Sequence, residues 1–333
     1  MFTRHSLGRA RLGSMRRASK HPRRPRPYGK RYRLASPLRP LAGALGFSVV
    51  SRDFYSPVPD IASLSSDVWT RRSPLRGLAF DIDAQLGFLA EQLGPHLAEL
   101  QPPSHSDDPA RYHLDNSYYR SVEAEALHAM IRHLKPARVV ELGSGFSSLI
   151  IAEACEANRR DGNRVDYRIY DPFPDRVRAA LAAGLHGIDE VVPLGAADVP
   201  DSVFAQLGDG DVLFVDTTHT VKVGGDVNHI VLDVLPTLAP GVAVHFHDVF
   251  LPWEYPRSWV EDMERYWAEQ YLLQAFLAHN DSWEVLLATY AVTREHPAEV
   301  ARLVPSFEPA RARPDAPAAF WLRRVANESL RRD

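Results

Sequence analysis

Five acidic residues and two histidines stand at or close to the ends of apolar runs in this sequence. The acids are Glu141, Asp171, Asp198, Asp216 and Asp248, and the histidines are His219 and His247. Carboxylate oxygens and imidazole nitrogens are ligands for divalent cations, and an imidazole can also move a proton near neutral pH. Ligands of an open parallel sheet bind beyond the carboxyl ends of its strands. If the apolar runs are such strands, these side chains share one edge of the sheet and form a candidate site.

The segment RVVELGSGFSS over 138–148 predicts a strand, a turn and the start of a helix. Gly143 can take positive φ and Gly145 has no Cβ, so the backbone can approach a ligand that also faces the first amides of the helix. Ser148 stands where a dinucleotide-binding motif has its third glycine, which favours a nucleoside without phosphates. The alternative is a tight turn without a ligand. The residues that we place at a cofactor here are Glu141, Gly143, Ser144, Gly145 and Ser147.

Two further acids are candidates for the nucleoside. Asp171 follows the second apolar run, where an acid can accept hydrogen bonds from ribose hydroxyls; the alternative is a turn aspartate before Pro172. Asp198 either meets an adenine amino group or caps the helix expected near Pro200. Asp216, at the neighbouring strand end, is also placed at the cofactor.

Asp216, His219, His247 and Asp248 suggest the chemistry of the site. His219 lies in a loop just after a strand end and is the candidate general base, or it orients Asp216 instead. Asp216, His247 and Asp248 are candidate ligands of Mg²⁺ or another divalent cation, with Asp248 as a turn cap the alternative. His245, inside an apolar strand, is expected to be a hydrogen-bonded core residue. We therefore take His219 and Asp216 as the candidate catalytic residues.

Strands and helices alternate along most of the chain, which predicts an α/β fold with a doubly wound, mostly parallel sheet. The expected strands cover 138–142, 165–170, 190–194, 211–216, 241–248, 283–292 and 318–325. The expected helices cover 81–100, 121–134, 147–160, 175–183, 200–207, 226–238 and 259–280. The resulting domains are a basic tail over 1–40, an N-terminal helical cap over 41–115 and a catalytic domain over 116–328.

Charge is distributed unevenly along the 333 residues. The net charge is −3, yet residues 1–40 carry 13 Lys and Arg and no acid, which leaves 26 basic and 42 acidic residues for the remainder. This proline-rich tail is expected to be disordered. An extension without a role, a nucleic-acid or anionic-lipid contact and an organellar presequence are its open interpretations.

The remaining composition excludes several classes of protein. The sole cysteine, Cys155, rules out an intramolecular disulfide and is expected in the core; a reducing cytoplasm is the expected compartment. The longest apolar runs are too short for a membrane span, since about 20 residues are needed. Nucleic acid is not expected as a partner except through the tail, and a homodimer is left open.

Taken in order, several segments resemble the class I S-adenosylmethionine-dependent methyltransferases, in the bacterial methyltransferase-24-like branch. They are YSPVPD (55–60), NSYYRSVEAEAL (116–127), RVVELGSGFSS, VDTTHT (215–220), GGDVNH (224–229) and HFHDVFLPWEYP (245–256). The resemblance implies a Rossmann-like sheet of seven strands with the last one antiparallel. It also implies that Glu141, Gly143 and Gly145 hold the methionine and sugar side of S-adenosyl-L-methionine and that Asp171 holds its ribose. Relatives similar to catechol O-methyltransferase place magnesium at the positions of Asp216 and Asp248, but here His247 precedes Asp248.

The expected function is methyl transfer from S-adenosylmethionine to a small-molecule acceptor, with oxygen as the nucleophile. In-line transfer from a sulfonium requires an oriented acceptor in a dry site, and 81–134 with 249–258 are expected to cover it. Two alternatives stay open: a nicotinamide-dependent oxidoreductase, and a non-catalytic module that binds a cofactor or polyanions.

Overall fold

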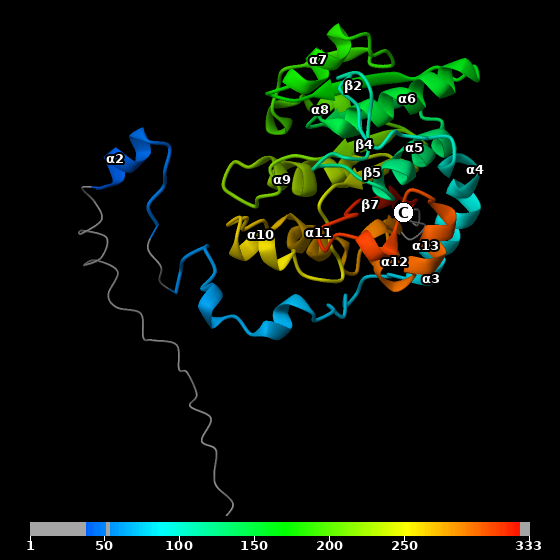
Figure 1. Ribbon diagram of the computed structural model, residues 1–333. Coiled ribbons are helices and arrows are strands. Elements are labelled where there is room, and N and C mark those ends of the chain that lie inside the picture. The colour runs from blue at the N-terminus through cyan, green and yellow to red at the C-terminus, as the bar shows by residue number, and fades with distance from the viewer. Residues whose placement is uncertain (1–37, 51–53, 327–333) are drawn as a thin grey trace, which may run out of the picture. The chain divides into compact units, whose positions relative to one another are not determined.

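A single sheet of seven strands forms the centre of the computed structural model, which describes residues 38–50 and 54–326 (Figure 1). The strand order across the sheet is β3-β2-β1-β4-β5-β7-β6. The strands are β1 (Arg138–Leu142), β2 (Asp166–Tyr170), β3 (Glu190–Val192), β4 (Val212–Val215), β5 (Ala243–Phe246), β6 (Trp283–Ala288) and β7 (Phe320–Arg324). The α/β class and the seven predicted strands are confirmed.

The strand directions follow the expectation as well. The pairs β1–β2, β2–β3, β1–β4 and β4–β5 are parallel, whereas β7 runs antiparallel to both β5 and β6. The last strand in sequence is therefore antiparallel, as the family resemblance implied, and it is inserted between β5 and β6.

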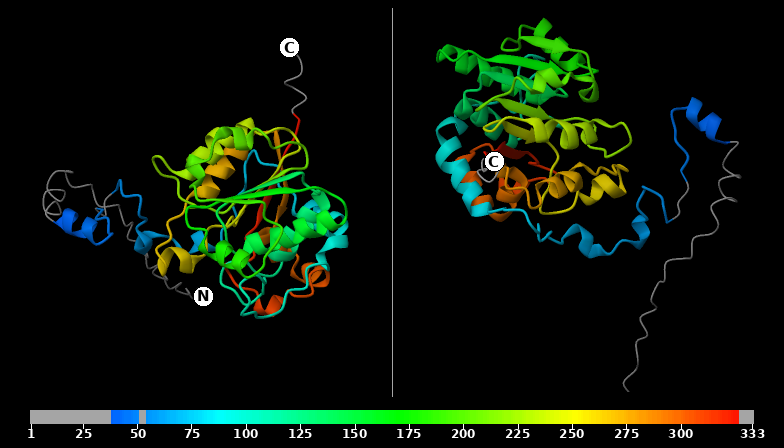
Figure 2. Two further views of the ribbon diagram at one scale, coloured as in Figure 1. Left: turned by 90° about the horizontal axis from the view of Figure 1, so that it is seen from above. Right: turned by 180° about the vertical axis from the view of Figure 1, so that it is seen from behind.

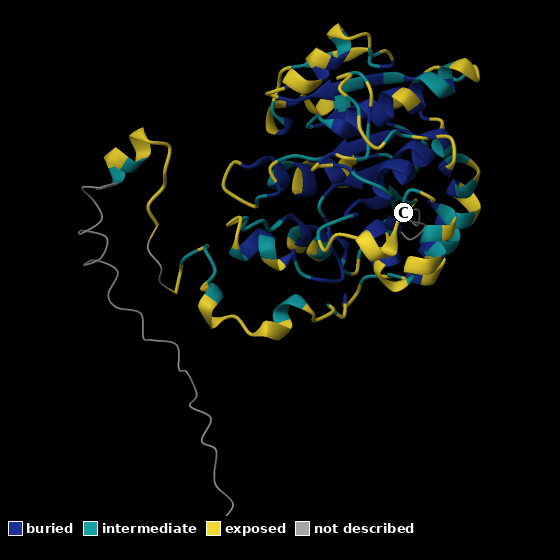
Figure 3. Ribbon diagram, viewed as in Figure 1, coloured by how far each residue is buried: buried dark blue, intermediate teal, exposed yellow. Residues whose placement is uncertain are grey.

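Strands β4 and β5 read as continuous apolar runs because both faces of the sheet are covered. Every residue of Val212–Val215 and of Ala243–Phe246 is buried, including His245 within β5. Figure 3 shows these strands in the dark blue of buried residues, with exposed residues on the outer sides of the helices.

Helices cover the two faces of the sheet. In the view from above, one layer holds α5 and α6 and the opposite layer holds α9 and α11 (Figure 2). The α-helices are α2 (Leu38–Ala44), α3 (Ile82–Phe88), α4 (Gly94–Leu97), α5 (Glu123–Leu134), α6 (Phe146–Arg160), α7 (Asp175–Ala182), α8 (Asp201–Phe204), α9 (Asp226–His229), α10 (Arg257–Glu261), α11 (Glu269–Leu277), α12 (Thr289–Glu295) and α13 (Pro297–Leu303). The 3-10 turns are η1 (Ile61–Ser63), η2 (Ser66–Trp69), η4 (Ala196–Asp198), η6 (Leu235–Thr237) and η7 (Pro309–Arg311), and the π-helical turns are η3 (Leu89–Leu93) and η5 (Ile230–Val234).

Most predicted helices are present with small shifts of their ends. The helix expected over 81–100 runs from α3 through η3 to α4, and it begins where the Asp81 carboxylate accepts a 3.0 Å hydrogen bond from the Ala84 amide. Cys155 is fully buried in α6, and burial raises the pKa of its thiol, so the expected core role is confirmed.

Two element predictions are wrong in part. The helix expected over 259–280 is interrupted between Glu261 and Glu269, because the chain leaves the helical path there to contact residue 219. The strand expected over 283–292 ends at Ala288. Its successor Thr289 exchanges hydrogen bonds with Ala319, and α12 begins.

The chain divides into two compact units, Met1–Ser63 and Leu64–Asp333. The first contains α2 and η1, and the second contains the sheet. The predicted boundaries at residues 40 and 115 differ from this division and remain predictions. Residues 1–37 of the predicted tail lie outside the described residues, and 38–40 begin α2. Among the described residues, no helix combines the length and the apolar character that crossing a membrane requires.

Candidate functional site

The register of the parallel strands places four of the predicted site residues in one row. Leu142 of β1 pairs with Tyr170 of β2 and with Val215 of β4, and Val215 pairs with Phe246 of β5. The next residues of these strands are Asp171, Gly143, Asp216 and His247. The amides of Gly143, Asp216 and His247 continue the ladder by donating to Tyr170, Leu142 and Val215. The expectation that these residues share one sheet edge is therefore met.

The two glycines of the turn differ in backbone conformation and in the space around them. Gly143 has φ +81°, and a Cβ on it would overlap the carbonyl oxygen of Asp216. Gly145 has extended backbone, and a Cβ there would meet no atom within 4 Å. Gly143 thus lets β1 pass close to β4. Gly145 leaves open space in front of α6.

Glu141 lies beneath this turn. Its carboxylate is fully buried and accepts hydrogen bonds from Ser147 (2.8 Å), Ser148 (3.1 Å) and the hydroxyl of Tyr167. Burial raises its pKa to about 8 against the opposing effect of these hydrogen bonds. Its carboxylate therefore holds the first turn of α6 in place, and direct contact of Glu141 or Ser147 with a cofactor remains a prediction.

Asp171 faces the turn from the end of β2. Its carboxylate accepts hydrogen bonds from the Ser144 hydroxyl and, at 2.7 Å, from the amide of Phe173. The ring of Phe173 is 82% exposed. The acid and the serine therefore lie together beside the glycine turn, with the exposed Phe173 two residues along the chain, whereas Asp198 lies exposed in η4.

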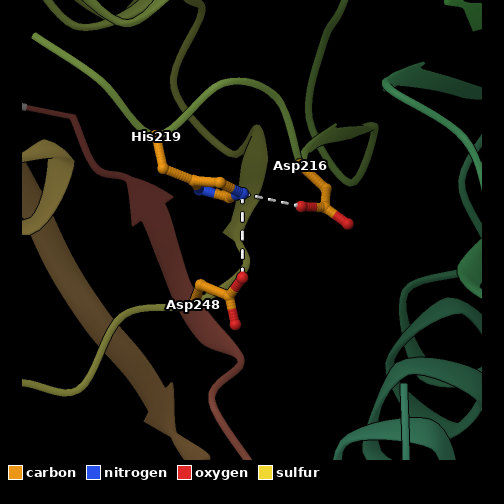
Figure 4. Close-up of side chains that lie close together, drawn as sticks. All are labelled: Asp216, His219 and Asp248. Atoms are coloured by element: carbon orange, nitrogen blue, oxygen red, sulfur yellow. Dashed lines mark ion pairs between the residues drawn. The ribbon is translucent and has the colours of Figure 1, made fainter. Parts of the chain in front are cut away.

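Asp216, His219 and Asp248 form a compact cluster at the ends of β4 and β5 (Figure 4). The Nε2 atom of His219 lies 3.1 Å from Asp216 Oδ1 and 3.7 Å from Asp248 Oδ2. One ligand atom from each of the three residues lies within 4.8 Å of the other two. Two carboxylates and one imidazole are a donor set that suits a divalent cation.

Both ends of this cluster have unusual backbone conformations. His219 has φ +56° and Asp248 has φ +57°. Such left-handed residues are uncommon outside glycine, although Asp and His are enriched among them, and they concentrate at functional sites. Two of the three cluster residues therefore have a backbone conformation that costs conformational free energy.

Helix α11 and the segment before it hold His219 from the opposite side. The Nδ1 atom of His219 lies 2.9 Å from Glu269 Oε2, and the ring of Trp267 packs on the imidazole with centroids 4.3 Å apart. The amides of Ala268 and Glu269 donate to the carbonyl oxygen of His219. These contacts explain the break in the helix predicted over 259–280.

The surrounding carboxylates decide the charge of His219. Burial opposes the charged imidazole, but the hydrogen bonds to Asp216 and Glu269 outweigh it and raise the pKa of His219 to about 10. The ring is therefore protonated on both nitrogens and positively charged at neutral pH in this arrangement. The predicted role as a general base would require one of these protons to leave first.

His247 lies beside the cluster with both ring nitrogens near carboxylates. Its Nδ1 is 3.4 Å from Asp248 and 3.8 Å from Asp216, and its Nε2 is 3.4 Å from the buried Glu123. Its place in the predicted ligand set remains a prediction. His245 is fully buried and stacked on Phe214 at 4.0 Å, which confirms it as a core histidine.

A protein-family model described as a methyltransferase domain, Methyltransf_24, matches residues 140–249. This segment resembles that domain. It contains the glycine turn, Asp171 and all three cluster residues, so the family resemblance seen in the sequence is confirmed over the segment that forms the site.

A search of curated proteins finds an uncharacterized protein of Archaeoglobus fulgidus that is 30% identical over 129 residues. The match covers 36% of this chain and 57% of that protein, so the chain spans little more than half of this relative's length. Among solved structures, cmcI-N160 with SAH is 16% identical, covering 70% of this chain and 91% of that one, with a TM-score of 0.37. The plantazolicin methyltransferase BamL, in complex with a triazolic desmethylPZN analog and SAH, is 8% identical over 74% of this chain and 97% of its own, with a TM-score of 0.37.

Four residues at the site escaped the sequence analysis: Ser148 as a partner of Glu141, Tyr167, Trp267 and Glu269. Tyr167 and Ser148 reach Glu141 only after β1, β2 and α6 have packed. Trp267 and Glu269 lie 48 and 50 residues after His219, beyond the segment that the methyltransferase model matches. The one signal in the sequence was Glu269, an acid within the amphipathic stretch 259–280. A buried acid needs a hydrogen-bond or charge partner, so such a residue points to a partner elsewhere in the fold.

Proposed function

We propose that the protein transfers a methyl group from S-adenosylmethionine to a small-molecule acceptor whose nucleophile is an oxygen. The observation that carries the proposal is the direct contact between the two halves of the site. The glycine turn of β1 passes so close to Asp216 that residue 143 has no room for a side chain. A ligand at the turn and an acceptor at the cluster would therefore be neighbours.

The residues around the turn fit a nucleoside cofactor. Gly145 leaves open space where a side chain would stand, its neighbour Ser144 donates to Asp171, and the exposed Phe173 follows Asp171 by two residues. Asp171 would accept hydrogen bonds from ribose hydroxyls, and Phe173 offers an apolar face to a base. When bound, S-adenosylmethionine supplies an activated methyl group on a sulfonium.

The cluster fits a divalent cation by the chemistry of its donors. Asp216 and Asp248 would supply oxygen ligands and His219 Nε2 a nitrogen ligand. When bound there, the cation would lower the pKa of an acceptor hydroxyl. If no cation is used, His219 itself would have to lose its proton and act as the base.

The segment after β5 supplies a dry wall for the reaction. Phe250 packs edge to face against Tyr255, Trp259 and Tyr290, with centroids between 5.0 and 5.8 Å apart. Close to Asp248, this aromatic cluster would exclude water and orient an acceptor, which is the main contribution that methyl transfer needs from a protein.

Calorimetric titration with S-adenosylmethionine and, separately, with NADH tests the assignment. We expect saturable binding of the first and none of the second, because Ser148 replaces the glycine that dinucleotide sites need. A folded protein that binds NADH and does not bind S-adenosylmethionine would favour the oxidoreductase alternative.

A second experiment identifies the acceptor. Incubation with S-adenosylmethionine and a metabolite extract, followed by mass spectrometry, should reveal the acceptor as a compound that gains one methylene.

A cytoplasmic location and a homodimer remain proposals. The first is supported by the single buried Cys155 and the lack of a disulfide pair in the sequence.

A further inference from the structure

Glu269 is a buried acid whose carboxylate hydrogen-bonds to one side chain among the described residues, that of His219. It is 1% exposed and begins α11. Its Oε2 lies 2.9 Å from His219 Nδ1, and its Oε1 has no hydrogen-bond partner among the described residues. Enclosing a carboxylate away from water is costly unless its hydrogen bonds compensate. The contact with His219 is therefore the structural reason for an acid at this position.

Three consecutive residues fix His219 in both position and rotation. The Trp267 ring covers one face of the imidazole, and the amides of Ala268 and Glu269 hold the carbonyl oxygen of residue 219 at 3.0 and 3.3 Å. These hydrogen bonds stabilise the left-handed backbone of His219. The Glu269 side chain then determines which ring nitrogen points away from α11.

A neutral imidazole has one N–H and one lone pair, and an ionised carboxylate only accepts hydrogen bonds. If a cation replaces the Nε2 proton, contact with Glu269 would keep the remaining proton on Nδ1 and leave the lone pair of Nε2 facing the cation between Asp216 and Asp248. Carboxylates that hold the second nitrogen of a metal-binding histidine are a general device for orienting the ring.

We propose that Glu269 is the positioning residue that makes His219 Nε2 a ligand for a divalent cation shared with Asp216 and Asp248. This inference rests on the cation site of the proposed function. It joins α11, which lies outside the methyltransferase domain segment, to the chemistry at β4 and β5.

Mn²⁺ binding to the full chain tests the proposal, measured by calorimetry and electron paramagnetic resonance for the wild type, Glu269→Ala and Glu269→Gln. Loss of such a partner weakens metal affinity by about 10- to 100-fold, which we expect for Glu269→Ala. Glu269→Gln keeps an oxygen acceptor for the Nδ1 proton, so its loss should be smaller. Glu125→Gln is the matched control, because Glu125 is equally buried and hydrogen-bonded to Ser306 and Val122, away from the cluster.

A spectroscopic measurement separates positioning from a general structural effect. In the Mg²⁺-loaded protein labelled with ¹⁵N-histidine, the His219 signal, assigned by its absence in His219→Asn, should show the proton on Nδ1. Glu269→Ala should give a mixture of tautomers, whereas Glu125→Gln should not.

Three results would overturn the inference. They are unchanged Mn²⁺ affinity in Glu269→Ala, equal losses in Glu269→Ala and Glu125→Gln, and no Mn²⁺ binding by the wild type. If the wild type binds S-adenosylmethionine but not Mn²⁺, this inference fails while methyl transfer stands. Failure to bind S-adenosylmethionine contradicts the proposed function itself.

Discussion

Gly143 and Asp216 touch through their backbones across β1 and β4, at the point where both strands end. The amide of Asp216 donates to Leu142, and a Cβ on residue 143 would overlap the Asp216 carbonyl oxygen. The turn that we assign to the cofactor and the cluster that we assign to the acceptor therefore cannot move independently.

Alanine substitutions of the two glycines should separate folding from binding. Gly143→Ala combines a backbone clash with φ +81° and should cost about 3 kcal/mol or more of unfolding free energy. Gly145→Ala has extended φ and free space, so stability should change by less than about 0.5 kcal/mol. Its new methyl group would occupy the space that we assign to the cofactor, so S-adenosylmethionine affinity should fall. Denaturant unfolding measures the stability of each variant, and calorimetry measures its affinity for S-adenosylmethionine. A Gly143→Ala protein as stable as the wild type would contradict the close approach of residue 143 to Asp216.

Glu141 should make stability depend on pH in the direction opposite to an ordinary carboxylate. Its pKa is about 8 in the folded protein against 4.5 unfolded, so the folded state retains the proton longer. The stability it contributes is full below pH 4.5 and is lost as the pH rises through about 8. Between pH 5 and 8, the wild type should lose on the order of 3 kcal/mol more unfolding free energy than Glu141→Gln. Parallel pH dependences in the two proteins would show that Glu141 is ionised when folded.

Removal of divalent cations should abolish methyl transfer once an acceptor is known. We expect activity to disappear in excess chelator and to return with Mg²⁺ or Mn²⁺, because Asp216, His219 and Asp248 supply a suitable donor set. Asp248→Asn should lower the cation affinity. Full activity in chelator would rule out the cation and leave His219 as the base.

His219→Ala should lower kcat by about 100-fold or more while S-adenosylmethionine affinity stays unchanged. The reason is spatial: the ion pairs of the ring are with Asp216, Asp248 and Glu269, which lie at the cluster. Rate measurements under saturating cofactor, paired with calorimetry, provide the check. Equal loss of turnover and cofactor binding would mean that His219 is structural.

Arg132 should be the strongest electrostatic contributor to the packing of α5 on its neighbours. Its guanidinium is largely buried and donates to Glu99 (2.6 Å), Asp161 (2.7 Å) and Asn158. Arg132→Ala should cost about 2–3 kcal/mol of unfolding free energy, because polar partners lose a buried contact. The exposed pair Arg257–Glu261 is the control, and Arg257→Ala should cost less than about 0.5 kcal/mol. Similar losses of unfolding free energy in Arg132→Ala and Arg257→Ala would show that burial of Arg132 does not strengthen its ion pairs.

The sequence predicted the sheet well because its strands are short apolar runs separated by turns and helices. The row Asp171, Gly143, Asp216 and His247 followed from parallel pairing, since each residue comes just after a run. The break between Glu261 and Glu269 was not predictable, because no proline or glycine marks it and its cause is a contact with residue 219. The role of Glu269 was not predictable for the same reason, because its partner His219 lies far away in the sequence. The charge of His219 could not be inferred either, since it depends on three carboxylates that only the folded chain brings together.

The insertion of β7 between β5 and β6 has a consequence for how the protein is made. During translation, β6 emerges before β7, its one partner among the described strands, so its backbone groups stay unpaired until residues 320–324 leave the ribosome. The strands from β3 to β5 have all their parallel partners by residue 246, and only the edge of β5 that pairs with β7 still lacks its partner. Until β7 is available, the nascent chain therefore exposes the unpaired edges of β5 and β6, which are sites for intermolecular strand pairing.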